Sequence, residues 1–154
     1  MDYKLEKIKM PYSKYDRYIA ILELIGALVL IGFWIGWFLD ILKSFTPDDP
    51  LYETYMAFES AFPIPDTWIV VLLLISSYGI WKEKSYGSFF AAAAGGALVF
   101  LGLIDISFNI QQGVYQHDPL AILINLTATV GGGILLIWFG RYYFILNGNS
   151  MKPN

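Results

Sequence analysis

The sequence contains no cysteine and only one histidine, His117. The lack of cysteine excludes disulfides, thiolate nucleophiles, and zinc or iron–sulfur sites held by cysteine. A single histidine also argues against a haem with two histidine ligands and against a histidine-rich metal centre. We therefore expect no cofactor.

Charged residues are scarce as well. They make up 15% of the 154 residues, whereas hydrophobic residues make up 56%. This composition is too apolar for an ordinary soluble domain of this length and is typical of a membrane protein, so we expect the lipid bilayer to surround a single domain. The net charge is −3 and the basic residues form no patch, which argues against a nucleic-acid partner.

Several apolar stretches are long enough to cross a bilayer. The clearest is 88–110, SFFAAAAGGALVFLGLIDISFNI, which as a helix is about 34 Å long against a hydrocarbon core of about 30 Å. The sequence predicts an all-α integral membrane protein, a bundle of four transmembrane helices at approximately 18–42, 66–82, 88–110 and 120–143. Residues 1–17 and the tail 144–154 are expected to lie outside the membrane.

Between the first two crossings the pattern indicates a short amphipathic helix on the extracytoplasmic surface. Pro63 and Pro65 are expected to end it, and Asp66 or Thr67 to cap the second crossing. Its apolar positions recur at helical spacing, with Glu53 and Glu59 among them: Leu51, Tyr55, Phe58 and Phe62.

The basic residues predict the orientation of the bundle. The N-terminal segment has five Lys or Arg, the turn at 82–84 has two and the C-terminal end has two, whereas Lys43 alone lies on the other side. Because cytoplasmic loops carry the excess of Lys and Arg, both termini are expected in the cytoplasm of a cell-membrane protein.

Small residues line one face of the third and fourth crossings, where Gly95 and Gly132 predict close backbone packing. Phe100 falls on the opposite face and is expected to meet lipid. Gly32 and Gly36 form a GxxxG pair in the first crossing, which predicts a second close helix contact or an oligomer interface.

The small face of the third crossing becomes polar toward its outer end, at Asp105 and Asn109. Asn125 of the fourth crossing is expected at the same depth, Asp40 near the outer end of the first crossing, and Glu59 nearby on the surface helix. A carboxylate in the membrane costs about 2.5–3.5 kcal/mol, so a retained one usually binds something or is paired. These five residues form the predicted ligand site, with Asp105 as its functional carboxylate.

Glu23 lies five residues into the first crossing on the cytoplasmic side. We expect its long side chain to reach the interface or to pair with a nearby cation: Lys82, Lys84 or Arg141.

An aspartate near the end of the first crossing, a surface segment and then Glu-x-x-Phe-Pro from Glu59 to Pro63 together resemble the four-helix EXPERA membrane proteins, which bind or isomerise sterols. The other acidic and aromatic positions of that family do not match here. The resemblance implies an intramembrane lipid ligand.

Three functions fit this sequence. The first is a membrane protein with an outward polar pocket that binds or translocates a small cation, a proton or an amphiphile. The second is a membrane-embedded isomerase or lipid-modifying enzyme that uses Asp105 or Glu59 as acid and base, which requires a partner within hydrogen-bond reach. The third is an accessory subunit whose acids contact a larger membrane protein.

Overall fold

The computed structural model describes residues 10–150, with side chains over 10–142. About 80% of the described residues are helical, and they contain no strand. The elements in chain order are α1 (Lys14–Phe38), α2 (Tyr52–Glu59), α3 (Pro63–Trp81), α4 (Ser85–Gln112), α5 (Val114–His117) and α6 (Leu120–Ser150).

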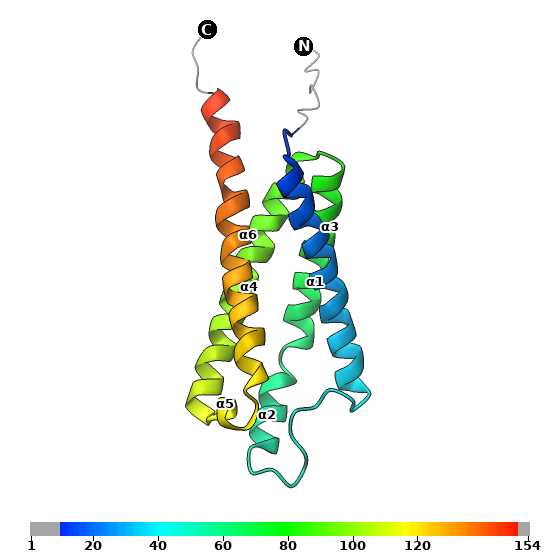
Figure 1. The fold of residues 1–154 in the computed structure, drawn as a ribbon, viewed down its shortest axis with the longest axis vertical. Coiled ribbons are helices and arrows are strands. Elements are labelled where there is room, and N and C mark those ends of the chain that lie inside the picture. The colour runs from blue at the N-terminus through cyan, green and yellow to red at the C-terminus, as the bar shows by residue number, and fades with distance from the viewer. Residues whose placement is uncertain (1–9, 151–154) are drawn as a thin grey trace.

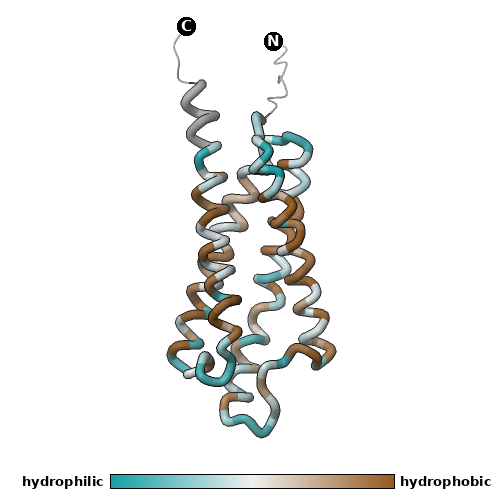
Figure 2. The backbone as a smooth tube through the Cα atoms, in the orientation of Figure 1, coloured by the Kyte–Doolittle hydropathy of each residue, from teal (hydrophilic) through white to brown (hydrophobic). Residues whose placement is uncertain are grey.

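Four helices of the described chain, α1, α3, α4 and α6, are long and apolar enough to cross a membrane, as predicted. They run up and down, so that both ends of the described chain and the α3–α4 turn lie at one end of the bundle, the terminal end (Figure 1). The short helices α2 and α5 lie at the opposite end, the α2 end. Figure 2 shows mostly hydrophobic residues between two more hydrophilic ends.

The packing is sequential: α1 contacts α3, α3 contacts α4, and α4 contacts α6. Ile69, Leu73 and Ile80 of α3 are almost completely buried between their neighbours. Toward the α2 end, α1 and α3 lie on one side and α4 and α6 on the other, with α2 between them (Figure 1). The aromatic side chains of α2 therefore lie where the two helix pairs diverge.

Helix α1 begins and ends four residues earlier than predicted, and local hydrogen bonds explain both differences. Ser13 caps the start: its side chain accepts from the Asp16 N–H, and its own N–H donates to the Asp16 carboxylate at 2.6 Å. At the other end Asp40 adopts a left-handed conformation with φ 58°, and the Ile41 N–H donates back to Gly36 at 2.9 Å. A left-handed residue of this kind ends a helix.

Two other helices extend beyond the predicted crossings. Pro63 begins α3 rather than only ending α2, because proline fits the first helical position, where no N–H partner is needed. Asp66 therefore lies inside the first turn of α3, and Phe62 takes the cap position. At the far end α6 continues to Ser150, beyond the predicted end at residue 143.

The predicted close packing of α4 on α6 is confirmed. A methyl group added at Gly95 would lie 2.5 Å from the Gly132 carbonyl oxygen, and one at Gly132 would lie 2.7 Å from the Gly95 oxygen. The pair in α1 differs: a methyl group at Gly32 meets nothing within 4 Å, and one at Gly36 meets Leu42 of the following loop. The expected helix contact at Gly32 and Gly36 is thus wrong within this chain.

Gly95→Ala should destabilise the protein by about 1–3 kcal/mol, because the added carbon meets backbone that cannot move aside. Gly96→Ala is the matched control: a methyl group there meets nothing within 4 Å, so the change should be neutral or stabilise by up to about 1 kcal/mol. Thermal unfolding in detergent measures both. Equal effects of the two substitutions would contradict the α4–α6 contact.

Candidate functional site

Three carboxyl groups from three helices approach one another at the α2 end. Glu59 belongs to α2, Asp66 to α3 and Asp105 to α4, and all are partly buried. Asp105 interacts electrostatically with the other two, and Glu59 with Asp66. Over residues 10–142, no Lys, Arg or His forms an ion pair with any of them. We call these residues the acid cluster.

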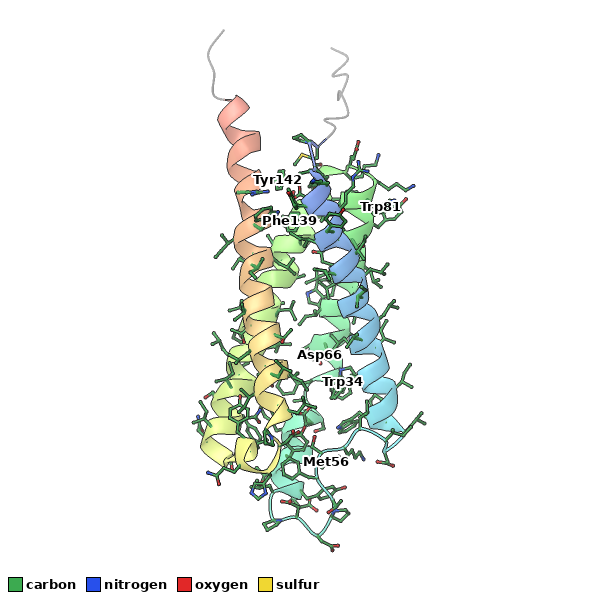
Figure 3. All side chains as sticks on the ribbon, viewed as in Figure 1. Trp34, Met56, Asp66, Trp81, Phe139 and Tyr142 are labelled. Carbon is green, nitrogen blue, oxygen red and sulfur yellow. The ribbon has the colours of Figure 1, made fainter. Side chains whose placement is uncertain are left out.

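Buried aromatic residues lie beside the acid cluster. Trp34 and Trp37 of α1 contact edge to face, with ring centroids 5.3 Å apart, and pack together with Phe62. The indole N–H of Trp34 donates to the Asp66 carboxylate at 2.9 Å, and Figure 3 shows the two side chains together. Ile104, next to Asp105 in α4, also packs against this group. We call Trp34, Trp37 and Phe62 the aromatic cluster.

The indole N–H of Trp37 is buried, and within the described part of the chain it has no hydrogen-bond acceptor. The residue is only 8% exposed. An indole nitrogen can only donate, and a buried donor without a partner costs about 1–3 kcal/mol. Trp37 therefore offers an unused donor within the aromatic cluster.

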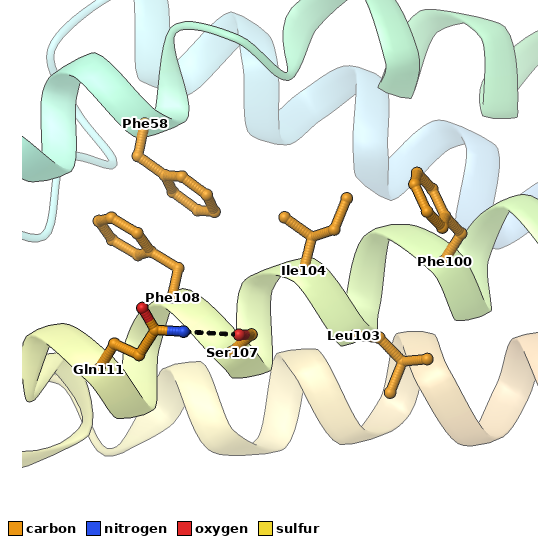
Figure 4. A pocket seen from close by; sticks show the side chains of 7 residues that line it. All are labelled: Phe58, Phe100, Leu103, Ile104, Ser107, Phe108 and Gln111. Atoms are coloured by element: carbon orange, nitrogen blue, oxygen red, sulfur yellow. Dashed lines mark hydrogen bonds between the residues drawn. The ribbon is translucent and has the colours of Figure 1, made fainter.

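An apolar groove of about 430 Å³ lies on the neighbouring surface of α4 (Figure 4). The rings of Phe58 and Phe108 stack across it with centroids 3.7 Å apart. Its polar atoms come from Gln111 and Ser107, which hydrogen-bond each other at 3.0 Å. Phe100, predicted to face lipid, also lines the groove and is 64% exposed.

The structure brings together only part of the predicted site. Asp105 and Glu59 are neighbours in the acid cluster. Asn109 and Asn125 are buried, but the Asn125 amide donates to the Tyr115 hydroxyl of α5 at 3.0 Å. Asp40 is exposed, forms an ion pair with Lys43 and ends α1, so a local structural role explains it.

Asp66 was expected to cap the second crossing, and the structure instead places it in the acid cluster. The signal that could have shown this is Pro63: as the first residue of a helix it puts Asp66 in the first turn, on the inner face. Trp34 gives no such signal, because its contact with Asp66 spans 32 residues of sequence.

Two acids nearer the terminal end are more deeply buried than the sequence suggests. Asp16 belongs to the segment 1–17, which is expected to lie outside the membrane, but it is 0% exposed and accepts hydrogen bonds from Trp138 at 2.7 Å and Tyr142 at 2.6 Å. Glu23 was expected to pair with a cation, but it hydrogen-bonds to Ser76 of α3 in the interior. Asp16 thus ties α1 to α6, and Glu23 ties α1 to α3.

Burial, together with the nearby charge of Asp66, raises the pKa of Glu59 from its usual 4.5 to about 7, against a hydrogen bond from Tyr55 that lowers it. We therefore expect Glu59 to titrate near neutral pH. Within the described residues, no group of three or more His, Cys, Asp or Glu is placed to hold a metal ion.

No family model, curated protein or solved structure matches this chain. Its function is therefore inferred from the chemistry of the site.

Glu59 should make the stability of the protein depend on pH. Because its pKa is higher in the folded state than its usual 4.5, the folded state binds the proton more tightly. Its stabilising contribution is then full below about pH 4.5, falls as the pH rises to about 7, and changes little above that, with a total of up to about 3 kcal/mol.

Denaturation of the wild type and Glu59→Gln across this pH range measures that contribution, which the substitution should remove. Glu53→Gln, an exposed acid on the same short helix, is the control and should follow the wild type. A wild-type pH profile in Glu59→Gln would show that Glu59 titrates as an ordinary surface acid.

Proposed function

We propose that this chain is a multi-pass protein of the cell membrane, with both termini in the cytoplasm, that binds an organic cation at the acid cluster on the extracytoplasmic side. The observation that carries the proposal is the convergence of Glu59, Asp66 and Asp105 with no basic partner among the described side chains. Unpaired carboxyl groups in a low-dielectric site attract a cation or retain protons.

The neighbouring side chains support an organic cation over a metal ion. The described acids do not converge closely enough to chelate a metal. The ring of Trp34 can attract an ammonium group through a cation–π interaction, which is strongest when the cation is desolvated, and the Lys43 ammonium already lies 5.0 Å from the ring centroid of Trp37. The unused N–H of Trp37 favours a ligand that also carries an acceptor oxygen.

An amphiphile with a cationic head group is the form of this ligand that the surroundings favour. The groove beside Phe58 and Phe108 is apolar and lies next to the acid-bearing face of α4, where it can accommodate a hydrocarbon chain. Toward the terminal end the interior is filled by apolar side chains such as Leu72 and Leu73, which are each 4% exposed. This filling supports binding at the site rather than passage of an ion through the bundle.

The orientation is testable by cysteine labelling, since the chain has no cysteine of its own. Ser44→Cys and Gln116→Cys lie at exposed positions of the α2 end and should react with a membrane-impermeant maleimide from outside intact cells. Ser85→Cys, exposed at the terminal end, should react only after the membrane is opened. Labelling of Ser85→Cys from outside would reverse the orientation.

The ligand class is testable with benzyltrimethylammonium and its neutral isostere neopentylbenzene, by thermal shift and calorimetry on protein in nanodiscs. The ammonium compound should bind and the neutral isostere should not. Affinity should rise as the pH increases through about 7, because the cation then no longer competes with the proton on Glu59.

Asp105→Asn should weaken binding of the ammonium compound by about tenfold or more, which is the effect of losing about 1.4 kcal/mol. Asp40→Asn is the matched control, because Asp40 is exposed and paired with Lys43, and it should bind as the wild type does. Equal binding by the neutral isostere, or wild-type binding by Asp105→Asn, would contradict the proposed function.

A further inference from the structure

A carboxyl group outside the acid cluster, that of Glu23 on α1, is buried nearer the terminal end and is 3% exposed. The Ser76 hydroxyl oxygen of α3 lies 2.8 and 3.0 Å from its two oxygens. The same hydroxyl oxygen lies 3.1 Å from the backbone carbonyl oxygen of Gly87 in α4. Three helices therefore meet at one serine hydroxyl.

The number of protons shared by Ser76, Glu23 and the Gly87 carbonyl indicates whether Glu23 is ionised or neutral. A serine hydroxyl has one proton to donate, yet it faces two acceptors, the Glu23 carboxyl and the Gly87 carbonyl. An ionised Glu23 would take that proton, and its charge would be buried with a single hydroxyl as donor. A neutral Glu23 donates its own proton to Ser76, which then donates to Gly87, so every hydrogen has an acceptor.

The helices packed around Glu23 supply no counter-charge. Helix α3 has no charged residue between Asp66 and Lys82, and α4 has none between Lys84 and Asp105. Asp66 and Asp105 belong to the acid cluster at the α2 end, and Lys82 and Lys84 are exposed in the α3–α4 turn, where neither forms an ion pair with Glu23 among the described side chains. A carboxylate in the apolar interior is stable only when it is paired, so the surroundings also favour the neutral acid.

The remaining charged or titratable groups near this region are already engaged. Asp16 on α1 accepts from Trp138 and lies 3.6 Å from Arg141 of α6. Tyr12 interacts electrostatically with Glu23, and its hydroxyl donates to the Lys84 carbonyl at 2.9 Å. Arg141 therefore lies beside Asp16 rather than Glu23, and Tyr12 carries no positive charge, so neither residue neutralises a Glu23 carboxylate.

We propose that Glu23 is a proton-binding site, whose bound proton completes a hydrogen-bond chain from α1 through Ser76 to the backbone of α4. The proton holds three helices together at one level of the bundle. Its loss leaves an unpaired buried charge and loosens the contacts of α1 with α3 and α4. The site is separate from the acid cluster and does not depend on the proposed organic cation.

Infrared spectroscopy of the protein in nanodiscs at neutral pH tests the proposal directly. The wild type should show the carbonyl stretch of a protonated carboxylic acid, and the difference spectrum against Glu23→Gln should contain that band. Ser76→Ala should keep the band but shift it to higher frequency, because the acid loses its acceptor. Asp16→Asn is the control and should leave the band unchanged, because Asp16 accepts hydrogen bonds as a carboxylate.

A second measurement follows thermal unfolding from about pH 5 to about pH 9 in a background that carries Glu59→Gln, Asp66→Asn and Asp105→Asn, which removes the titration of all three carboxyl groups of the acid cluster. The unfolding temperature should fall by several degrees as the pH rises. Adding Glu23→Gln should make the profile flat, since the amide donates to Ser76 at every pH.

Absence of the acid band from the wild-type difference spectrum would overturn the proposal, as would an unchanged pH profile after Glu23→Gln. If Glu23→Gln does not fold, the Ser76→Ala spectrum decides instead. An unshifted band there would show that no protonated Glu23 donates to Ser76. Loss of cation binding at the acid cluster alters none of these outcomes.

Discussion

A carboxyl group inside an apolar helix bundle needs hydrogen-bond donors, a counter-charge or a proton from its immediate surroundings, because apolar side chains and lipid supply none of these. Asp16 satisfies the requirement completely. It accepts from Trp138, Tyr142 and its own cap residue Ser13, and Arg141 lies 3.6 Å away. This interaction joins α1 to α6, whose main helix contacts are with α3 and with α4 respectively, and so it closes the bundle at the terminal end.

At the α2 end the same requirement is not met. Trp34 gives Asp66 one donor, and Tyr55 gives one to Glu59, while the side chains described there offer Asp105 no basic partner. The helix pairs diverge at this end and α2 lies between them (Figure 1). This contrast in partners distinguishes an acid that holds the fold together from the acids to which we assign ligand binding as a proposal.

The sequence predicted features that depend on local composition. The four long apolar helices follow from runs of hydrophobic residues, and the contact between Gly95 and Gly132 follows from small residues on matching faces. The roles of Asp16 and Glu23 could not be predicted in this way. The partners of Asp16 on α6 lie 122 and 126 residues away, and Ser76 lies 53 residues from Glu23, so only the tertiary packing reveals them.

The partners of Asp105 could not be predicted from helix faces alone. Equal depth in the membrane suggested that Asn125 would serve Asp105, but the Asn125 amide donates to Tyr115 and thereby ties α6 to α5. Backbone packing places Asp105 instead: Gly102, three residues earlier, lies against Thr129 of α6 with no room for a side chain. That contact fixes the rotation of α4 against α6, and Asp105, three residues further along nearly the same face, is held where it interacts with Glu59 of α2 and Asp66 of α3. The position of the Asp105 carboxyl group thus depends on Gly102, which has no side chain that could take part in binding.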